Sequence, residues 1–289
     1  MSDIKAGFVG LGAMGQPMAG HLHKAGLLAC VWTRTQANTT AISAELGLAA
    51  PASLAELATQ CNVIALCVPQ DADVLADVET IAAHARPGCV VIDHSTVSSR
   101  TAREAQARMR VAGGDLIDAP VSGGVEGARN GKLSIMVGGE DATLERVRPV
   151  LECYAAKINH MGGVGAGQNT KAVNQVLVAG IAQAVCEGLA LGDALGLDAE
   201  RLIPTLLAGA AGNWFLDKRG QTMLANEFKV GFKLALLHKD LKIVRELARQ
   251  AGTDASIIEK CLADYAVLMA RGHGDDDISG LIRLKRASA

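Results

Sequence analysis

A glycine-rich segment near the start of the chain has the spacing of a phosphate-binding loop. It reads Gly10-Leu11-Gly12-Ala13-Met14-Gly15 and matches GxGxxG. An apolar run precedes it and a helical pattern follows it, which is the context in which this spacing binds a dinucleotide. Gly10 would permit the tight turn, Gly12 would let the backbone approach a pyrophosphate, and Gly15 would let the helix pack against the strand. The alternative is a glycine-rich turn without a ligand.

The residues after the second apolar run bear on the choice of cofactor. An NAD site usually places an acid about 20 residues after the glycines, where it binds the ribose 2′-hydroxyl. Here Thr33-Arg34-Thr35 occupies that place, and Arg34 follows Gly15 by 19 positions. Because a guanidinium pairs with a 2′-phosphate, NADP(H) is favoured and NAD(H) remains possible. Alternatively, Arg34 stacks on the adenine or is a solvated turn residue.

A lysine interrupts the apolar segment that opens the second half of the chain. Lys171 and Asn174 are three residues apart in GAGQNTKAVNQ, so they share one face of a helix. Partial burial would lower the lysine pKa from about 10.4 towards the range useful for general acid–base catalysis. The alternative is a lysine near a helix start that extends to water.

Three further polar segments could contribute to a site. Asp93-His94-Ser95-Thr96 follows a strand. Adjacent residues of an extended segment point to opposite faces, so these residues cannot converge as a hydrolase triad. We expect the hydroxyl groups to face the cofactor or the substrate. Successive N–H groups and the hydroxyl of Ser122-Gly123-Gly124 could bind a carboxylate, unless the segment is a plain turn. Lys239-Asp240 is either a site element or a charge pair on a helix surface. His21 and His23 do not share a helix face, so we expect no metal site.

The elements that must position these residues change in character along the chain. Short apolar runs alternate with helical patterns through about residue 160, which predicts a parallel sheet covered on both faces. These runs are 6–9, 29–32, 63–68, 90–92, 116–119 and 134–137. The first helix should run from about Gly12 to Ala25. A long helix over about 168–194 and further helices near 199–210, 235–251 and 255–270 should follow. The fold class is α/β, with an N-terminal domain over 1–164 and an all-α domain over 165–289.

Composition excludes several classes of protein. The 289 residues are 49% hydrophobic and 20% charged with a net charge of -2, which gives no reason to expect nucleic acid or an anionic membrane as partner. Asn174, Gln175 and Gln183 interrupt the longest apolar segment, so we expect no membrane span. The first residues lack a basic region, and we expect no signal peptide and a cytoplasmic location. Seven cysteines without a CxxC pair indicate neither a disulfide framework nor a zinc ribbon.

Taken together, the motifs resemble those of the β-hydroxyacid dehydrogenase family. The matching stretches are 7–19 (GFVGLGAMGQPMA), 93–96 (DHST), 118–139 (DAPVSGGVEGARNGKLSIMVGG), 165–175 (GAGQNTKAVNQ) and 238–241 (HKDL). The resemblance implies a Rossmann domain, a long interdomain helix and an all-α domain. It also implies that Lys171 is the catalytic acid and base and that Ser122, Gly123 and Gly124 bind the substrate carboxylate. Further implied site residues are Asn174, which orients the reacting oxygen, and Thr96 and Lys239, which lie by the nicotinamide or substrate.

The resemblance leads to a specific expectation for function. We expect hydride transfer between a nicotinamide and a small 3-hydroxy carboxylate or semialdehyde, in a homodimer or homotetramer. We count Thr35, Val68 and Pro69 among the candidate cofactor contacts. Gln175 stands where the family often has a second asparagine, and this departure leaves one polar contact open. The alternatives are a non-catalytic dinucleotide-sensing or structural protein, or a reductase of glyoxylate or an imine. Relatives that reduce imines typically lack the lysine.

Overall fold

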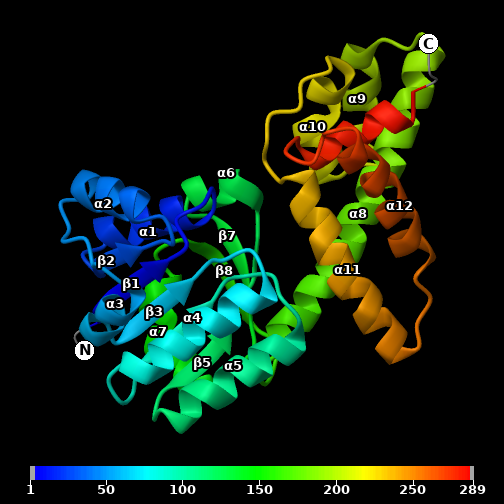
Figure 1. Ribbon diagram of the computed structural model, residues 1–289. Helices are drawn as coiled ribbons and strands as arrows, with labels where there is room; N and C mark the ends of the chain where they lie inside the picture. The colour runs from blue at the N-terminus through cyan, green and yellow to red at the C-terminus, as the bar shows by residue number, and fades with distance from the viewer. Residues whose placement is uncertain (1–3, 287–289) are drawn as a thin grey trace. The chain divides into compact units, whose positions relative to one another are not determined.

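The computed structural model describes residues 4–286. These residues form two compact units, which divide in the sequence between Lys171 and Ala172. The segment Met1–Asp3, on which the expectation about a signal peptide depends, lies outside the described residues. Both units are shown in Figure 1.

The first unit contains a parallel sheet of five strands in the order β2-β1-β3-β4-β5. All five match apolar runs expected from the sequence, within one or two residues at their ends. Their bounds are β1 Ala6–Val9, β2 Leu28–Trp32, β3 Val63–Leu66, β4 Val90–Asp93 and β5 Asp115–Asp118. The mixed α/β class with a parallel sheet is therefore confirmed. Because the strands are parallel, the polar residues that follow them gather at one edge of the sheet.

Helices cover both faces of this sheet, as the near-continuous apolar strands predict. Successive strand residues alternate between two cores: Ala65 packs with residues of α1 and α7, whereas Ile64 and Leu66 pack with residues of α3, α4 and α5. The layers are visible in Figure 1. The helices of this unit are α1 Gly15–Lys24, α2 Gln36–Glu45, α3 Leu54–Gln60, α4 Asp71–His84, α5 Ser99–Val111, α6 Gly124–Arg129 and α7 Asp141–Leu151.

A second sheet of three strands departs from the expectation. The run 134–137 was expected in the main sheet, but β7 (Leu133–Val137) pairs antiparallel with β6 (Val121–Ser122) and parallel with β8 (Ala155–His160). Strand β6 has only two residues. Strand β8 reads AAKINH and has no apolar run, and none of its residues is fully buried. Neither β6 nor β8 has an apolar run that would predict a strand from the sequence.

The second unit is helical. Helix α8 (Ala166–Ala194) begins within the first unit and continues into the second, as the long apolar segment predicts. The expected α9 (Ala199–Leu207), α11 (Leu234–Ala251) and α12 (Ser256–Ala270) are present. Two elements were missed: α10 (Trp214–Leu224) and a 3-10 helix, η1 (Ile278–Leu284). In the loop before η1, Asp277 is buried and accepts hydrogen bonds from the N–H groups of Gly231 and Phe232.

Helix α8 is long and apolar in spite of the polar residues that interrupt it. A window of 18 residues in it has a mean hydropathy of 1.5, enough to span a membrane by length and composition. The interruptions by Asn174, Gln175 and Gln183 therefore do not by themselves carry the expectation of no membrane span. About half of the window is buried, and a core helix of a soluble protein passes the same test.

Candidate active site

The GxGxxG segment connects β1 to α1 at the carboxyl edge of the main sheet. Gly10 has a φ of +90°, and a Cβ there would collide with the carbonyl oxygen of Cys67. A Cβ at Gly15 would collide with the carbonyl oxygen of Gly10. At Gly12, in contrast, a Cβ would meet nothing within 4 Å. Two of the glycines are thus required by packing and the third leaves open space, which fits the approach of a pyrophosphate.

Helix α1 begins at Gly15, three residues later than the sequence suggested. Residues Leu11–Met14 form a turn instead, and none of them is fully buried. The candidate cofactor contacts around this turn have different exposures. Val68 is half-buried next to Gly10, whereas Pro69 and Thr35 are exposed. A dinucleotide therefore fits a loop whose backbone is accessible at Leu11, Gly12 and Ala13.

Arg34 lies in the turn between β2 and α2. Its side chain is 69% exposed, and its Nη1 donates a hydrogen bond to Oδ1 of Asp73 at 2.9 Å. Arg34 is therefore a largely solvated turn residue whose guanidinium also pairs with an acid of α4. No local pattern around Arg34 indicates this pairing, because the two residues are 39 positions apart.

His94, directly after β4, is a buried structural brace. Its Nδ1 lies 2.7 Å from the carbonyl oxygen of Ala119, and its Nε2 lies 2.8 Å from the hydroxyl of Tyr154. Because a carbonyl can only accept, Nδ1 carries the proton and Nε2 accepts from Tyr154. Burial lowers the pKa of His94 to about 4, so the ring is neutral at pH 7. This neutral ring joins the polar segments that follow β4 and β5.

The buried His94 should make the fold sensitive to acid. Its pKa is about 4 in the folded chain and near 6.5 when unfolded, so below pH 6.5 the unfolded state binds the extra proton. Stability should fall as the pH decreases from 6.5 to 4, by about 3 kcal/mol from this residue alone. Thermal unfolding of wild type and His94→Gln across this range checks the effect, with the exposed His23→Gln as control. An equally steep decline in His94→Gln would contradict it.

Ser95 and Thr96 do not share one environment. The hydroxyl of Ser95 was expected to face a ligand, but Ser95 is 2% exposed and its Oγ accepts a hydrogen bond from the N–H of Val68 at 2.9 Å. It therefore fixes the segment after β3 rather than contacting a cofactor. Thr96 is half-buried and stays a candidate contact. Asp93 is fully buried, and burial raises its pKa to about 7.

Asp118, the last residue of β5, holds the start of helix α8. Its two carboxylate oxygens accept hydrogen bonds from the N–H groups of Gly165 at 2.7 Å and Gln168 at 2.8 Å. Burial raises the pKa of Asp118, although both hydrogen bonds act in the opposite direction. Gln168 adds a second link, because its amide donates to the carbonyl oxygen of Ser95 and accepts from the N–H of Val97. The sequence alone did not predict that Asp118 and Gln168 position the start of α8.

Lys171 is one helical turn beyond Gln168 on α8. It is 8% exposed, and its Nζ donates to the carbonyl oxygen of Val121 at 2.9 Å. Val121 immediately precedes the Ser122-Gly123-Gly124 loop, in which the two glycines have φ angles of 132° and 61°. An L side chain is strained at both angles, so the loop is not a plain turn that other residues could form. The structure thus brings Lys171 to the first residue of strand β6, immediately before this loop.

The remaining candidates lie in the second unit and form a network of their own. The amide of Asn174 donates to Gln175, and Gln175 donates to Oδ2 of Asp240 at 2.7 Å. Lys239 pairs with the other oxygen of Asp240 at 2.9 Å. Asp240 is 3% exposed, so a surface charge pair does not describe it. Gln175 therefore has a structural role. The one sign of this role in the sequence is that Gln175 stands where the family often has a second asparagine.

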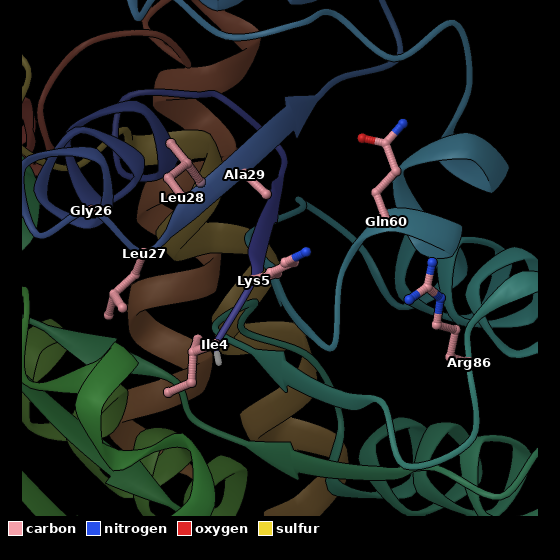
Figure 2. A pocket seen from close by; sticks show the side chains of 8 residues that line it. All are labelled: Ile4, Lys5, Gly26, Leu27, Leu28, Ala29, Gln60 and Arg86. Atoms are coloured by element: carbon pink, nitrogen blue, oxygen red, sulfur yellow. The ribbon is translucent and has the colours of Figure 1, made fainter. Parts of the chain in front are cut away.

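A cavity of about 500 Å³ lies elsewhere in the first unit (Figure 2). It is lined by residues that precede or begin β1 and β2, together with Gln60 and Arg86: Ile4, Lys5, Gly26, Leu27, Leu28 and Ala29. These residues lie at the amino ends of the strands, whereas the GxGxxG loop follows the carboxyl end of β1. The cavity is therefore separate from the candidate cofactor site. Within residues 4–286, no group of three or more His, Cys, Asp or Glu residues could hold a metal ion.

Two family models together cover almost the whole chain. One, described as the NAD binding domain of 6-phosphogluconate dehydrogenase, matches residues 5–163. The other, described as NAD-binding of NADP-dependent 3-hydroxyisobutyrate dehydrogenase, matches residues 165–285. The chain belongs to the β-hydroxyacid dehydrogenase family. It is an oxidoreductase of this family with an NAD(P)-binding domain, and the resemblance noted in the sequence is confirmed.

Similar members of the family align over nearly their full length. The 2-hydroxy-3-oxopropionate reductase of Escherichia coli is 34% identical, with 97% of this chain and 96% of that protein covered. The NAD-dependent L-serine dehydrogenase of Pseudomonas aeruginosa is 33% identical, with 96% of each covered. A structure of 3-hydroxyisobutyrate dehydrogenase from Mycobacterium tuberculosis with L-serine is 34% identical, covers 98% of this chain and 99% of its own, and has a TM-score of 0.88.

Proposed function

We propose that this β-hydroxyacid dehydrogenase prefers NADP(H) and transfers hydride between the nicotinamide and a small 3-hydroxy carboxylate or its semialdehyde. Lys171 is the general acid and base in this proposal. The observation that carries it is the burial of Lys171, 8% exposed, with its Nζ on the carbonyl oxygen of the residue before Ser122. A buried amine next to a loop of positive-φ glycines combines a proton carrier with N–H groups suited to a carboxylate.

The residues of this chain would divide the work as follows. The nicotinamide, when bound, accepts or supplies the hydride. The Ser122 hydroxyl and the N–H groups of Gly123 and Gly124 hold the substrate carboxylate. During oxidation the neutral amine of Lys171 takes the proton of the substrate hydroxyl, and during reduction its ammonium form returns a proton to that oxygen. Asn174, Lys239 and Thr96 are further candidate contacts on the strength of the family resemblance.

A panel of short acids tests the reaction class. We expect at least one short aldehyde acid to be reduced, which lowers the absorbance of NADPH. We expect the matching hydroxy acid to be oxidised by NADP⁺, which raises the absorbance as NADPH forms. The panel should include glyoxylate, 2-hydroxy-3-oxopropionate, 3-hydroxyisobutyrate and L-serine, because relatives carry names that include the last three. Tight binding of NADPH without turnover of any member would favour the non-catalytic dinucleotide-sensing protein instead.

Arg34 should carry the preference for NADP(H). A guanidinium paired with a 2′-phosphate forms a charge-assisted contact that NADH cannot make. Arg34→Ala should therefore raise the Michaelis constant for NADPH by about tenfold and change that for NADH by less than about twofold. Steady-state kinetics with both cofactors checks this expectation. Equal losses for the two cofactors would show that Arg34 does not recognise the 2′-phosphate.

We also propose that the chain forms a homodimer or homotetramer through helix α8. Val173 and Leu177, one turn apart on this helix, are 62% and 60% exposed, and Ile181 continues the same stripe. A contiguous apolar stripe of this kind is typical of an interface. Light scattering on the purified protein should give at least twice the chain mass of 29.9 kDa. Leu177→Glu should shift the mass towards the monomer, and a wild-type monomer at micromolar concentration would rule the proposal out.

A further inference from the structure

The ion pair between Arg34 and Asp73 joins two different parts of the candidate cofactor site. Arg34 follows β2, and Asp73 lies in the first turn of α4, the helix that follows β3. The guanidinium Nη1 and the Asp73 Oδ1 are 2.9 Å apart. Since Arg34 is the proposed ligand of the 2′-phosphate, the phosphate would share this guanidinium with a carboxylate that already pairs with it.

Asp73 depends on this arginine more than an ordinary surface acid would. Its side chain is 19% exposed, against 69% for Arg34. Its second oxygen, Oδ2, is buried and has no hydrogen-bond partner among the described residues. Loss of Arg34 from Oδ1 would leave a half-buried carboxylate without a counter-charge, which is unfavourable.

A second acid strengthens the dependence. Asp77 lies one turn after Asp73 on α4 and is half-buried on the same side of the helix. The pKa of Asp77 is raised to about 6, mainly by burial and also by the charge of Asp73, while the charge of Arg34 acts in the opposite direction. The charge of Arg34 therefore acts on both carboxyl groups. A dianionic phosphate placed beside Arg34 would enter the field of these two acids.

We propose that Asp73 is a specificity-determining residue that holds Arg34 and thereby weakens the preference for NADP(H) over NAD(H). The inference rests on the proposed role of Arg34 in binding the 2′-phosphate. A 2′-phosphate competes with Asp73 for the charge of the guanidinium, and any weakening of the ion pair leaves that carboxylate less neutralised beside Asp77 and the phosphate. NAD(H) has a hydroxyl at the same place and leaves the ion pair intact, so Asp73 disfavours only the phosphorylated cofactor.

Calorimetric titration of the full chain with NADP⁺ and with NAD⁺ tests the inference without relying on turnover. Asp73→Asn keeps the shape of the side chain and removes its charge. We expect it to tighten NADP⁺ binding by at least about threefold and to change NAD⁺ binding by less than about twofold. Glu79→Gln is the matched control, because Glu79 lies on the same helix and pairs with Arg108 at 3.4 Å. This control removes the same charge and should leave the ratio of the two affinities unchanged.

Arg34→Ala and the double variant separate the inference from the proposed function. If Asp73 acts through Arg34, the gain from Asp73→Asn should shrink to less than about 1.5-fold in the Arg34→Ala background. A full gain in that background would overturn the pairing mechanism. An unchanged affinity ratio in Asp73→Asn, with NADP⁺ binding still lost in Arg34→Ala, would overturn the role of Asp73 and leave that of Arg34 standing. Unchanged NADP⁺ binding in Arg34→Ala would overturn the proposed role of Arg34 itself, and the inference with it.

Discussion

Replacing Lys171 with alanine should lower turnover by at least about 100-fold, because general acid–base help from one side chain typically contributes that much or more. The dissociation constant for NADPH should change by less than about twofold, since the Nζ of Lys171 lies on the Val121 carbonyl oxygen rather than at the GxGxxG loop. Steady-state kinetics and a separate titration with NADPH give the two quantities. Lys157→Ala, at an exposed position of β8, controls for the loss of one positive charge.

A second substitution at the same position distinguishes charge from proton transfer. Lys171→Arg keeps the positive charge, but a guanidinium stays protonated and cannot act as a base in the oxidation direction. We therefore expect it to restore little of the lost oxidation rate. If Lys171→Ala turned over within a few-fold of wild type, the acid–base role would belong elsewhere, and Lys239 would be the next candidate.

Removing the carboxylate of Asp118 should give the largest loss of stability. Asp118→Ala leaves the N–H groups of Gly165 and Gln168 without their acceptors at the buried start of α8. Each unsatisfied buried group costs about 1 to 3 kcal/mol, so the loss of two acceptors should lower the free energy of unfolding by about 2 to 6 kcal/mol. Denaturant unfolding followed by circular dichroism measures the change.

Asp115→Ala is the matched control for Asp118. Asp115 begins the same strand and also accepts several hydrogen bonds, among them one from Thr143, but it lies at the other end of β5 and away from α8. We expect it to destabilise the chain by less than half as much. Equal losses in the two variants would show that the start of α8 is not specially dependent on Asp118.

Much of the fold was predictable because its signals are local. The apolar run 6–9 is strand β1 to the residue, and the glycine spacing that follows it has steric reasons that the structure makes explicit at Gly10 and Gly15. The long helix and three of the later helices were visible as helical patterns. These features depend on neighbouring residues, so a single sequence is sufficient to find them.

The parts that were missed depend on contacts distant in the sequence. Strand β8 has no apolar run and exists because β7 pairs with it. The partner of Arg34 lies 39 residues away on α4, and the partners of Asp118 lie 47 and 50 residues away at the start of α8. A hydroxyl at the end of a strand favours a ligand contact at Ser95, but the Oγ of Ser95 accepts a hydrogen bond from the N–H of Val68 instead.

The most direct test of Lys171 as the acid and base is a single turnover. Enzyme saturated with NADPH is mixed with an excess of the best aldehyde acid from the panel, and the loss of NADPH absorbance is followed in wild type and in Lys171→Ala. This measurement isolates the chemical step from product release. We predict that the variant reacts at least about 100-fold more slowly at saturating substrate. A variant that reacts within a few-fold of wild type would contradict the assignment of Lys171 as the group that moves the proton.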